Sequence, residues 1–313
     1  MQVPAALVVV LSVIFAPLES LGGEMRRLQW ESSIYVDSKG VGLNLPEGVA
    51  CESDALVVAD SGNARILRYS VSGETVTGEA EVDLPKAFPI KVRIAKNGDV
   101  YFLDARERRI GVIGADGEIR GFLKPKGLPF KTQVTPRSFD IDKRGLIYLL
   151  DIFSERVFVV DGEGQFVRQI RFPDEYGFLS DLTVDSQGNV FVVDSVAAVV
   201  FKAAGDSERL SALTESLKAF MNFPKSLAVD GRGVIYLVDQ NGSGLALVGY
   251  GGDFLGRKLS LGWNQGGLYY PSDICISETG NAFIADRNNS RVQVFKVNMG
   301  GSGGGSGEAR APE

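Results

Sequence analysis

The chain has 313 residues, a formal net charge of -6 and no histidine. Histidine is the usual proton carrier near neutral pH and the commonest metal ligand, so its absence excludes serine-type catalytic triads and histidine-bound zinc or copper. The acidic balance argues against a general nucleic-acid binder, because phosphate neutralisation needs an excess of Lys and Arg. The 38 glycines exceed average usage and indicate many tight turns between short strands.

The chain opens with an apolar run, Ala5 to Ala16, that has about the length of a secretory signal core. Small residues follow, and cleavage after Gly22 fits the pattern, so we predict a signal peptide over residues 1–22 and export to the periplasm or outside the cell. The opening MQVP carries no Lys or Arg, which leaves an uncleaved membrane anchor as the alternative. No later segment is apolar enough to span a bilayer, so we do not expect a membrane-spanning protein.

One unit then recurs six times, and in each copy an apolar run ends in Asp. The repeated aspartates are Asp60, Asp104, Asp151, Asp194, Asp239 and Asp286. They are 44, 47, 43, 45 and 47 residues apart, which is the length of a four-stranded propeller blade. In the copy from Phe223 to Asp239, two apolar runs flank a Gly-containing turn, as in a β-hairpin, and a third strand follows each Asp. The repeat therefore predicts an all-β protein.

Two copies carry a family motif. VVADSGNARILRYSVSGE, Val57 to Glu74, and FIADRNNSRVQVFKV, Phe283 to Val297, resemble the NHL-repeat signature of Val-Ala-Asp, Asn and Arg. This resemblance implies a six-bladed β-propeller, which we place at residues 24–298. The Gly/Ser-rich composition that follows predicts a disordered tail over residues 299–313.

The last copy ends at Val297 after its third strand, so its blade lacks an outer strand. The segment LQWESSIYV, Leu28 to Val36, has strand character and belongs to no other copy. We predict that it fills the vacancy, which joins the two ends of the domain and hides an open sheet edge.

Six carboxylates around one ring suggest a metal site or acid–base chemistry, but a catalytic site needs unlike groups at one place. An identical residue in every blade more simply holds the turn after the second strand and accepts backbone N–H bonds. In the four copies that keep an Arg five residues later, all but those of blades 4 and 5, it also pairs with that Arg. We assign this structural role to all six aspartates, and we expect no catalytic residue, metal or cofactor.

The only cysteines, Cys51 and Cys275, lie in the innermost strands of the first and last blades, which are neighbours at ring closure. Counted from Pro46 and Pro271 they are five and four residues along, so their side chains point to opposite faces of equivalent strands. Either they meet in the closure seam as a disulfide, which would suit an exported protein, or they point apart as two buried thiols.

Charge is unevenly distributed: Leu84 to Gly145 holds 14 Lys and Arg against 7 Asp and Glu. The repeat pattern places the basic residues in loops on one rim of blades 2 and 3, where they would steer an anionic partner; a solvated rim with no partner is the alternative. The candidate binding residues are Lys86, Lys91, Arg106, Arg108, Lys124, Lys126 and Lys131. Trp263, in the Gly-rich link between blades 5 and 6, is a further candidate contact residue.

These features favour a non-catalytic binding or scaffold module that contacts a protein or an anionic polymer through one face. The alternative is a hydrolase or lactonase similar to the calcium-dependent six-bladed propellers, in which carboxylates and amides from several inner strands converge on a metal. Against this enzyme alternative, the residues at the starts of the inner strands are mostly serines rather than clustered acids. They are Glu47, Ser138, Ser180, Ser226 and Ser272. Nucleic-acid binding, known for other NHL proteins, is disfavoured by both export and acidity.

Overall fold

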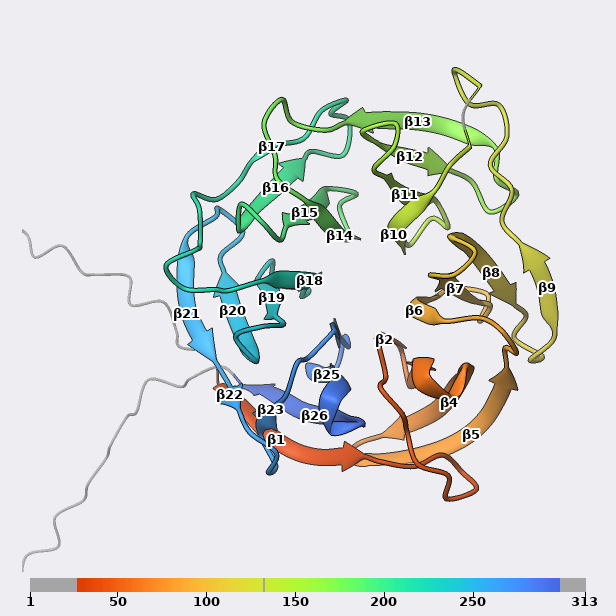
Figure 1. Cartoon of the computed structure of the whole chain (residues 1–313), viewed down its shortest axis with the longest axis vertical. Helices are drawn as coiled ribbons and strands as arrows, with labels where there is room; N and C mark the ends of the chain where they lie inside the picture. Colours follow the sequence, from red (N-terminus) through yellow and green to blue (C-terminus); the bar gives the residue numbers. More distant parts are fainter. Residues whose placement is uncertain (1–26, 132, 299–313) are drawn as a thin grey trace, which may run out of the picture.

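The computed structural model describes residues 27–131 and 133–298. Six four-stranded antiparallel sheets stand around a central axis as the blades of a ring (Figure 1). The predicted all-β, six-bladed propeller is therefore confirmed. The predicted signal peptide and Gly/Ser-rich tail lie outside the described residues.

In each blade the strands follow one another from the axis to the rim, so the first strand is innermost. Blade 1 comprises β2 (Gly48–Glu52), β3 (Ala55–Asp60), β4 (Arg65–Ser72) and β5 (Thr75–Asp83), with the short helix η1 (Ser61–Asn63) after β3. Blade 2 comprises β6 (Pro89–Ile94), β7 (Val100–Asp104), β8 (Arg109–Ile113) and β9 (Ile119–Phe122). Blade 3 comprises β10 (Pro136–Ile141), β11 (Ile147–Asp151), β12 (Arg156–Val160) and β13 (Phe166–Arg171).

The second half of the chain repeats this order. Blade 4 comprises β14 (Leu179–Val184), β15 (Val190–Asp194), β16 (Val199–Ala203) and β17 (Ser211–Ala212). Blade 5 comprises β18 (Pro224–Val229), β19 (Ile235–Asp239), β20 (Gly244–Val248) and β21 (Phe254–Lys258). The link to blade 6 contains the parallel pair β22 (Ser260–Leu261) and β23 (Gly267–Leu268). Blade 6 comprises β24 (Asp273–Ile276), β25 (Asn281–Asp286) and β26 (Arg291–Asn298), with η2 (Arg287–Asn289) after β25.

The fourth strand of blade 6 comes from the start of the domain. Strand β1 (Arg27–Ile34) pairs antiparallel with β26, and the register runs from Leu28 opposite Val297 to Ile34 opposite Val292. In Figure 1 this strand lies along the outside of blade 6 and leads into blade 1. The prediction that an N-terminal strand closes the ring is confirmed.

The hydrophobic core consists of apolar clusters between neighbouring blades rather than one central core. The cluster between blades 6 and 1, for example, contains Val49 and Leu56 on one side and Phe283 and Val292 on the other. Both faces of each blade are buried in this way, which explains why the second strands are continuous apolar runs instead of alternating ones. The central axis is thereby left to the polar residues of the inner strands.

The repeated aspartates are buried, as their structural assignment requires. In blade 1 the Oδ1 of Asp60 accepts the N–H of Asn44 at 2.7 Å, and in blade 6 the Oδ1 of Asp286 accepts the N–H of Tyr269 at 2.7 Å. In both blades the donor residue lies on the segment that leads into the inner strand. Each carboxylate thus ties the turn after the second strand to the start of its own blade.

Pairing with the Arg five residues later is found in only some blades of the described chain. Arg65 pairs with Asp60 and Arg291 with Asp286, each at 2.7 Å. The prediction is wrong for blade 2, where the Arg109 guanidinium lies 3.5 Å from the centre of the Phe122 ring. Arg156 of blade 3 similarly lies over Phe130. An aromatic ring near the outer strand offers these two side chains a different partner.

The two cysteines meet in the closure seam. A disulfide joins Cys51 in β2 to Cys275 in β24, with the two Cα atoms 6.0 Å apart. Blades 1 and 6 are therefore linked twice, by this bond near the axis and by β1 at the rim.

Candidate functional site

The axis of the propeller is lined by one equivalent residue from each inner strand. Each pairs with the residue just before the repeated Asp of its blade, for example Lys91 with Leu103 and Asp181 with Val193. We call these six residues the channel ring. They are Gly48, Lys91, Ser138, Asp181, Ser226 and Asp273. The six positions are equivalent in the backbone but carry four different residue types.

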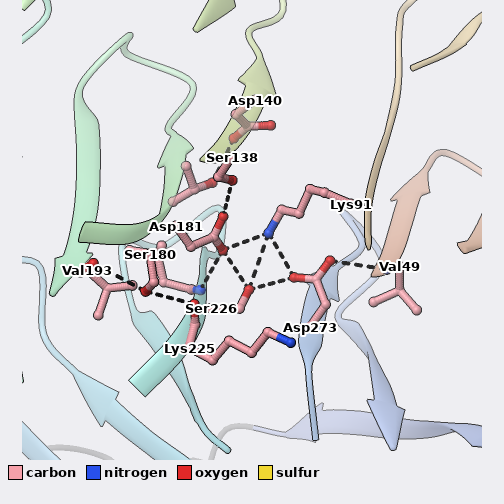
Figure 2. A network of polar contacts seen from close by, with 12 residues as sticks. Val49, Lys91, Ser138, Asp140, Ser180, Asp181, Val193, Lys225, Ser226 and Asp273 are labelled. Atoms are coloured by element: carbon pink, nitrogen blue, oxygen red, sulfur yellow. Dashed lines mark hydrogen bonds and ion pairs between the residues drawn. The ribbon is translucent and has the colours of Figure 1, made fainter. Parts of the chain in front are cut away.

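An ammonium occupies the centre of the channel ring. The Nζ of Lys91 lies 2.6 Å from Asp181 Oδ2, 2.9 Å from Asp273 Oδ1 and 3.3 Å from Ser226 Oγ. Figure 2 shows Lys91 pointing between these three side chains, which come from three other blades. The network is closed by the Oγ of Ser226, 2.6 Å from Asp181 Oδ2 and 2.5 Å from Asp273 Oδ1. Lys91 is only 5% exposed.

The two carboxylates also satisfy backbone groups that the inner strands leave unpaired at the channel. The N–H of Leu227 donates to Asp181 Oδ2 at 3.1 Å, and the N–H of Val49 donates to Asp273 Oδ2 at 3.1 Å. Each acceptor thus reaches from its own blade to the free edge of the next. Burial acts to raise the pKa of Asp181, but Lys91, Arg93 and the hydrogen bonds it accepts outweigh burial and leave this pKa below its ordinary value.

A second ion pair lies deeper in the channel, two residues along the strands. Arg93 Nε donates to Asp140 Oδ1 at 2.5 Å. The other oxygen of Asp140 accepts the Thr183 hydroxyl at 2.9 Å and the Val184 N–H at 2.8 Å. Burial acts to lower the pKa of Arg93, but the surrounding carboxylates, with Asp140 first, raise it above its ordinary value. The charged side chains inside the channel are therefore ion-paired with one another.

Above the channel ring, the residue before each ring member forms what we call the mouth ring. Its members are Glu47, Ile90, Arg137, Ser180, Lys225 and Ser272. Lys225 Nζ lies 2.6 Å from Glu47 Oε2, and Arg287 pairs with the other oxygen of Glu47. The mouth ring and all channel-ring residues except Gly48 line an open pocket of about 230 Å³.

Arg137 enters the mouth from another side. Its guanidinium lies 4.8 Å from the centre of the Phe178 ring, and it belongs to no ion pair among the residues of 27–131 and 133–298. The residue is exposed overall, and the partial burial of its charged group lowers the pKa of Arg137. Attraction by Asp181 raises that pKa and repulsion by Arg108 lowers it further.

The far end of the channel is crossed by an exposed ion pair. Lys143, in the turn after β10, lies 2.7 Å from Glu278, in the turn after β24, so the pair connects blades 3 and 6 on opposite sides of the ring. Both side chains are about two-thirds exposed. Water screens such a pair, so we attribute little stability to it.

The structure separates the predicted basic residues into three places. Lys86, Arg106 and Arg108 are exposed in the loops of blade 2, and Arg106 Nη1 donates to the Lys86 carbonyl at 3.0 Å. Lys91 was expected on the same rim, and that expectation is wrong, since its side chain is buried at the axis. The reason is its register within β6, where it stands two residues after Pro89 and faces the channel.

Lys124 and Lys126 lie at the outer edge of blade 3 rather than near the mouth. The N–H of Lys126 donates to the Gly164 carbonyl at 2.8 Å, beside the start of outer strand β13. Both side chains are exposed, as is Lys131. Trp263 is 68% exposed and lies beside Tyr269 in the link to blade 6.

Sequence reasoning missed Asp181, Asp273 and the pair Arg93–Asp140. A usable signal was present, because alignment of the blades on the residue two after the inner-strand proline, with Leu179 in its place in blade 4, gives the channel ring directly. The residues that the sequence analysis compared at the starts of the inner strands came from both rings. Ser138 and Ser226 belong to the channel ring, whereas Glu47, Ser180 and Ser272 belong to the mouth ring.

The residues at the axis do not fit a resident calcium ion. Calcium needs six to eight oxygen ligands, commonly including carboxylates. Asp181 and Asp273 are already paired with the Lys91 ammonium, and within residues 27–131 and 133–298 no group of three or more His, Cys, Asp or Glu is placed to hold a metal. The protein supplies its own cation at this place.

The geometry defines a six-bladed β-propeller whose channel is closed by internal ion pairs. The NHL repeat family model matches residues 268–295, which include most of blade 6. A comparison with curated proteins finds no match. In the described part of the chain no helix is long and apolar enough to cross a membrane.

Solved structures with the same fold include enzymes. A streptogramin B lyase has 13% identity and a TM-score of 0.59, over 87% of this chain and 98% of that one. A gluconolactonase from Xanthomonas campestris has 16% identity and a TM-score of 0.62, over 87% and 90%. A protein of unknown function from Bacteroides thetaiotaomicron has 17% identity and a TM-score of 0.62, over 87% and 76%. At these identities the likeness concerns the fold.

Proposed function

We propose that the protein is an exported, non-catalytic binding module that contacts a protein or anionic polymer through the face that carries the channel mouth. The observation that carries the proposal is the set of exposed cations on this face of an acidic protein. They are Lys86, Arg106, Arg108 and Arg137, with Glu107 as the acid in the same loop. Such a patch steers an anionic partner and orients its approach.

The channel itself supports binding over catalysis. A general acid or base needs a group that can exchange its proton with substrate. The acids of the channel ring are ion-paired with Lys91, and Asp140 is ion-paired with Arg93. The chemistry of the lyase and the lactonase with this fold is therefore not carried over to this chain. The disulfide and the apolar run at Ala5 to Ala16 support export, because disulfides persist in oxidising compartments.

Charge reversal tests the binding face. The triple variant K86E/R106E/R108E should lose capture of the partner in a pull-down from the protein's own envelope extract. The variant K124E/K126E/K131E, in the exposed segment between β9 and β10, should retain it. Both variants change the net charge equally, so the comparison isolates position. Equal capture by the two variants would remove the mouth face from consideration. Amino-terminal sequencing of the protein recovered from a periplasmic or secreted fraction tests the export.

A further inference from the structure

The channel mouth has the size of a pocket for one chemical group. Its open pocket of about 230 Å³ far exceeds the roughly 10–15 Å³ of accessible space that is needed to hold one water molecule. The floor is the channel ring, where Lys91 blocks further passage. A ligand can therefore place one end in the mouth but cannot pass through the ring.

The mouth has an excess of positive charge. Glu47 is shared between Lys225 and Arg287, so one carboxylate serves two cations. Arg137 adds a third cation without an acidic partner in the described chain. Below them, Lys91 faces two carboxylates, but these also accept N–H and hydroxyl donors that stabilise their charge. A negative group in the cavity would meet Arg137 on one side and Lys225 on the other.

Exposed apolar side chains lie on the same face as Arg137. Its guanidinium lies over Phe178, and Phe153 and Val196, in the loops that follow Asp151 and Asp194 on the same face, are 66% and 54% exposed. Arg and aromatic side chains are the residues enriched at the centres of protein interfaces. A densely charged polymer would gain nothing from exposed Phe and Val, so this rim favours a protein partner.

We propose, building on the binding function above, that the mouth binds a single carboxylate of a partner protein between Arg137 and Lys225. The guanidinium presents two parallel N–H donors, which match the two oxygens of a carboxylate. Lys225 contributes the second positive charge, and the exposed side chains of blades 3 and 4 contact the residues around the inserted acid. The carboxylate comes from an acidic side chain or from a chain terminus.

Small carboxylates test the pocket without the partner. N-acetyl-glutamate N-methylamide carries only the side-chain carboxylate, and N-acetyl-alanine carries only the terminal one, so the two probes separate the two sources. Either probe should shift the Arg137 Nε–H resonance in an NMR titration, while neutral N-acetyl-glutamine N-methylamide should not. Arg137→Gln should weaken binding at least about tenfold, as expected for loss of a charge-assisted hydrogen bond. Arg137→Lys should restore it only in part, because the charge remains and the fork is lost.

Arg232→Gln is the matched control, because Arg232 is also an exposed arginine but lies in the turn between β18 and β19, at the far end of the channel. It should leave probe binding unchanged. Absence of a shift with both carboxylates, or equal loss in R137Q and R232Q, would overturn the pocket. Failure of the carboxylate pocket can be distinguished from failure of the proposed binding face. If K86E/R106E/R108E abolishes capture from the extract while R137Q does not, the face binds a partner and the carboxylate pocket is refuted.

Discussion

Lys91 and Ser226 belong to blades on opposite sides of the ring, yet the Lys91 ammonium lies 3.3 Å from the Ser226 hydroxyl oxygen. The lysine side chain thus crosses the axis, and on the way it meets the carboxylates of two further blades. Neighbouring blades are held by apolar contacts, whereas Lys91 links blade 2 to blades 4, 5 and 6, with which blade 2 shares no apolar cluster in the described chain. Ion pairs and hydrogen bonds at the axis therefore link blades on opposite sides of the propeller.

Removal of the ammonium should strongly destabilise the propeller. Lys91→Met keeps the length of the side chain but leaves Asp181 and Asp273 buried without a counter-charge. Loss of one partner from a buried ion pair costs about 3–5 kcal/mol. Urea denaturation should show a loss of this size for K91M, against less than about 0.5 kcal/mol for the exposed control K124M.

The same network predicts a rescue. Replacement of both acids in K91M/D181N/D273N removes the uncompensated charge, so the triple variant should be more stable than K91M itself. A triple variant less stable than K91M would mean that the carboxylates contribute through shape and backbone hydrogen bonds rather than through charge.

The pH dependence of stability should report Asp181. Its folded pKa lies below the ordinary 3.8, so its contribution is fully present above that value and is lost as the pH falls through the lower folded pKa. The difference in unfolding free energy between the protein and D181N should therefore shrink as the pH falls below about 4. A difference that stays constant through this acid range would contradict the assignment.

The repeat and the closing strand could be predicted from sequence because both depend on local pattern. The Asp at the end of each apolar run set the blade count, and the strand character of residues 28–36 supplied the missing strand. The disulfide remained one of two alternatives, since strand alternation fixes which face Cys51 uses but not how closely blades 1 and 6 approach. Proximity of residues in distant blades is a property of the closed ring.

The polar network at the axis was missed for the same physical reason. Lys91 looked like a rim residue because charged side chains are seldom fully buried. Its burial depends on Asp181 and Asp273, which lie 90 and 182 residues further along the chain. A local pattern cannot show such partners, although alignment of equivalent blade positions would have placed all three in one ring.

The repeated aspartates should differ in importance according to their partners. Asp286→Asn leaves Arg291, which is 2% exposed, without its carboxylate, and should cost about 3–5 kcal/mol. Asp104→Asn should cost only about 1 kcal/mol, because Asn can still accept the Phe88 N–H and Arg109 stacks on Phe122 instead. Chemical denaturation of the two single variants gives the comparison, and equal losses would show that the arginine pairing is energetically minor.

The two closures of the ring should support each other. C51A/C275A removes the cross-link between residues 224 positions apart, which we expect to cost about 2–5 kcal/mol, and deletion of residues 27–34 removes the outer strand of blade 6. Either change alone leaves blades 1 and 6 joined by the other link, so the combined variant should lose more stability than the sum of the two. Urea midpoints of all four proteins measure the coupling. As a control, reductant should lower the midpoint of the parent protein to that of C51A/C275A and leave that variant unchanged. A deletion with an undiminished midpoint would refute closure by β1.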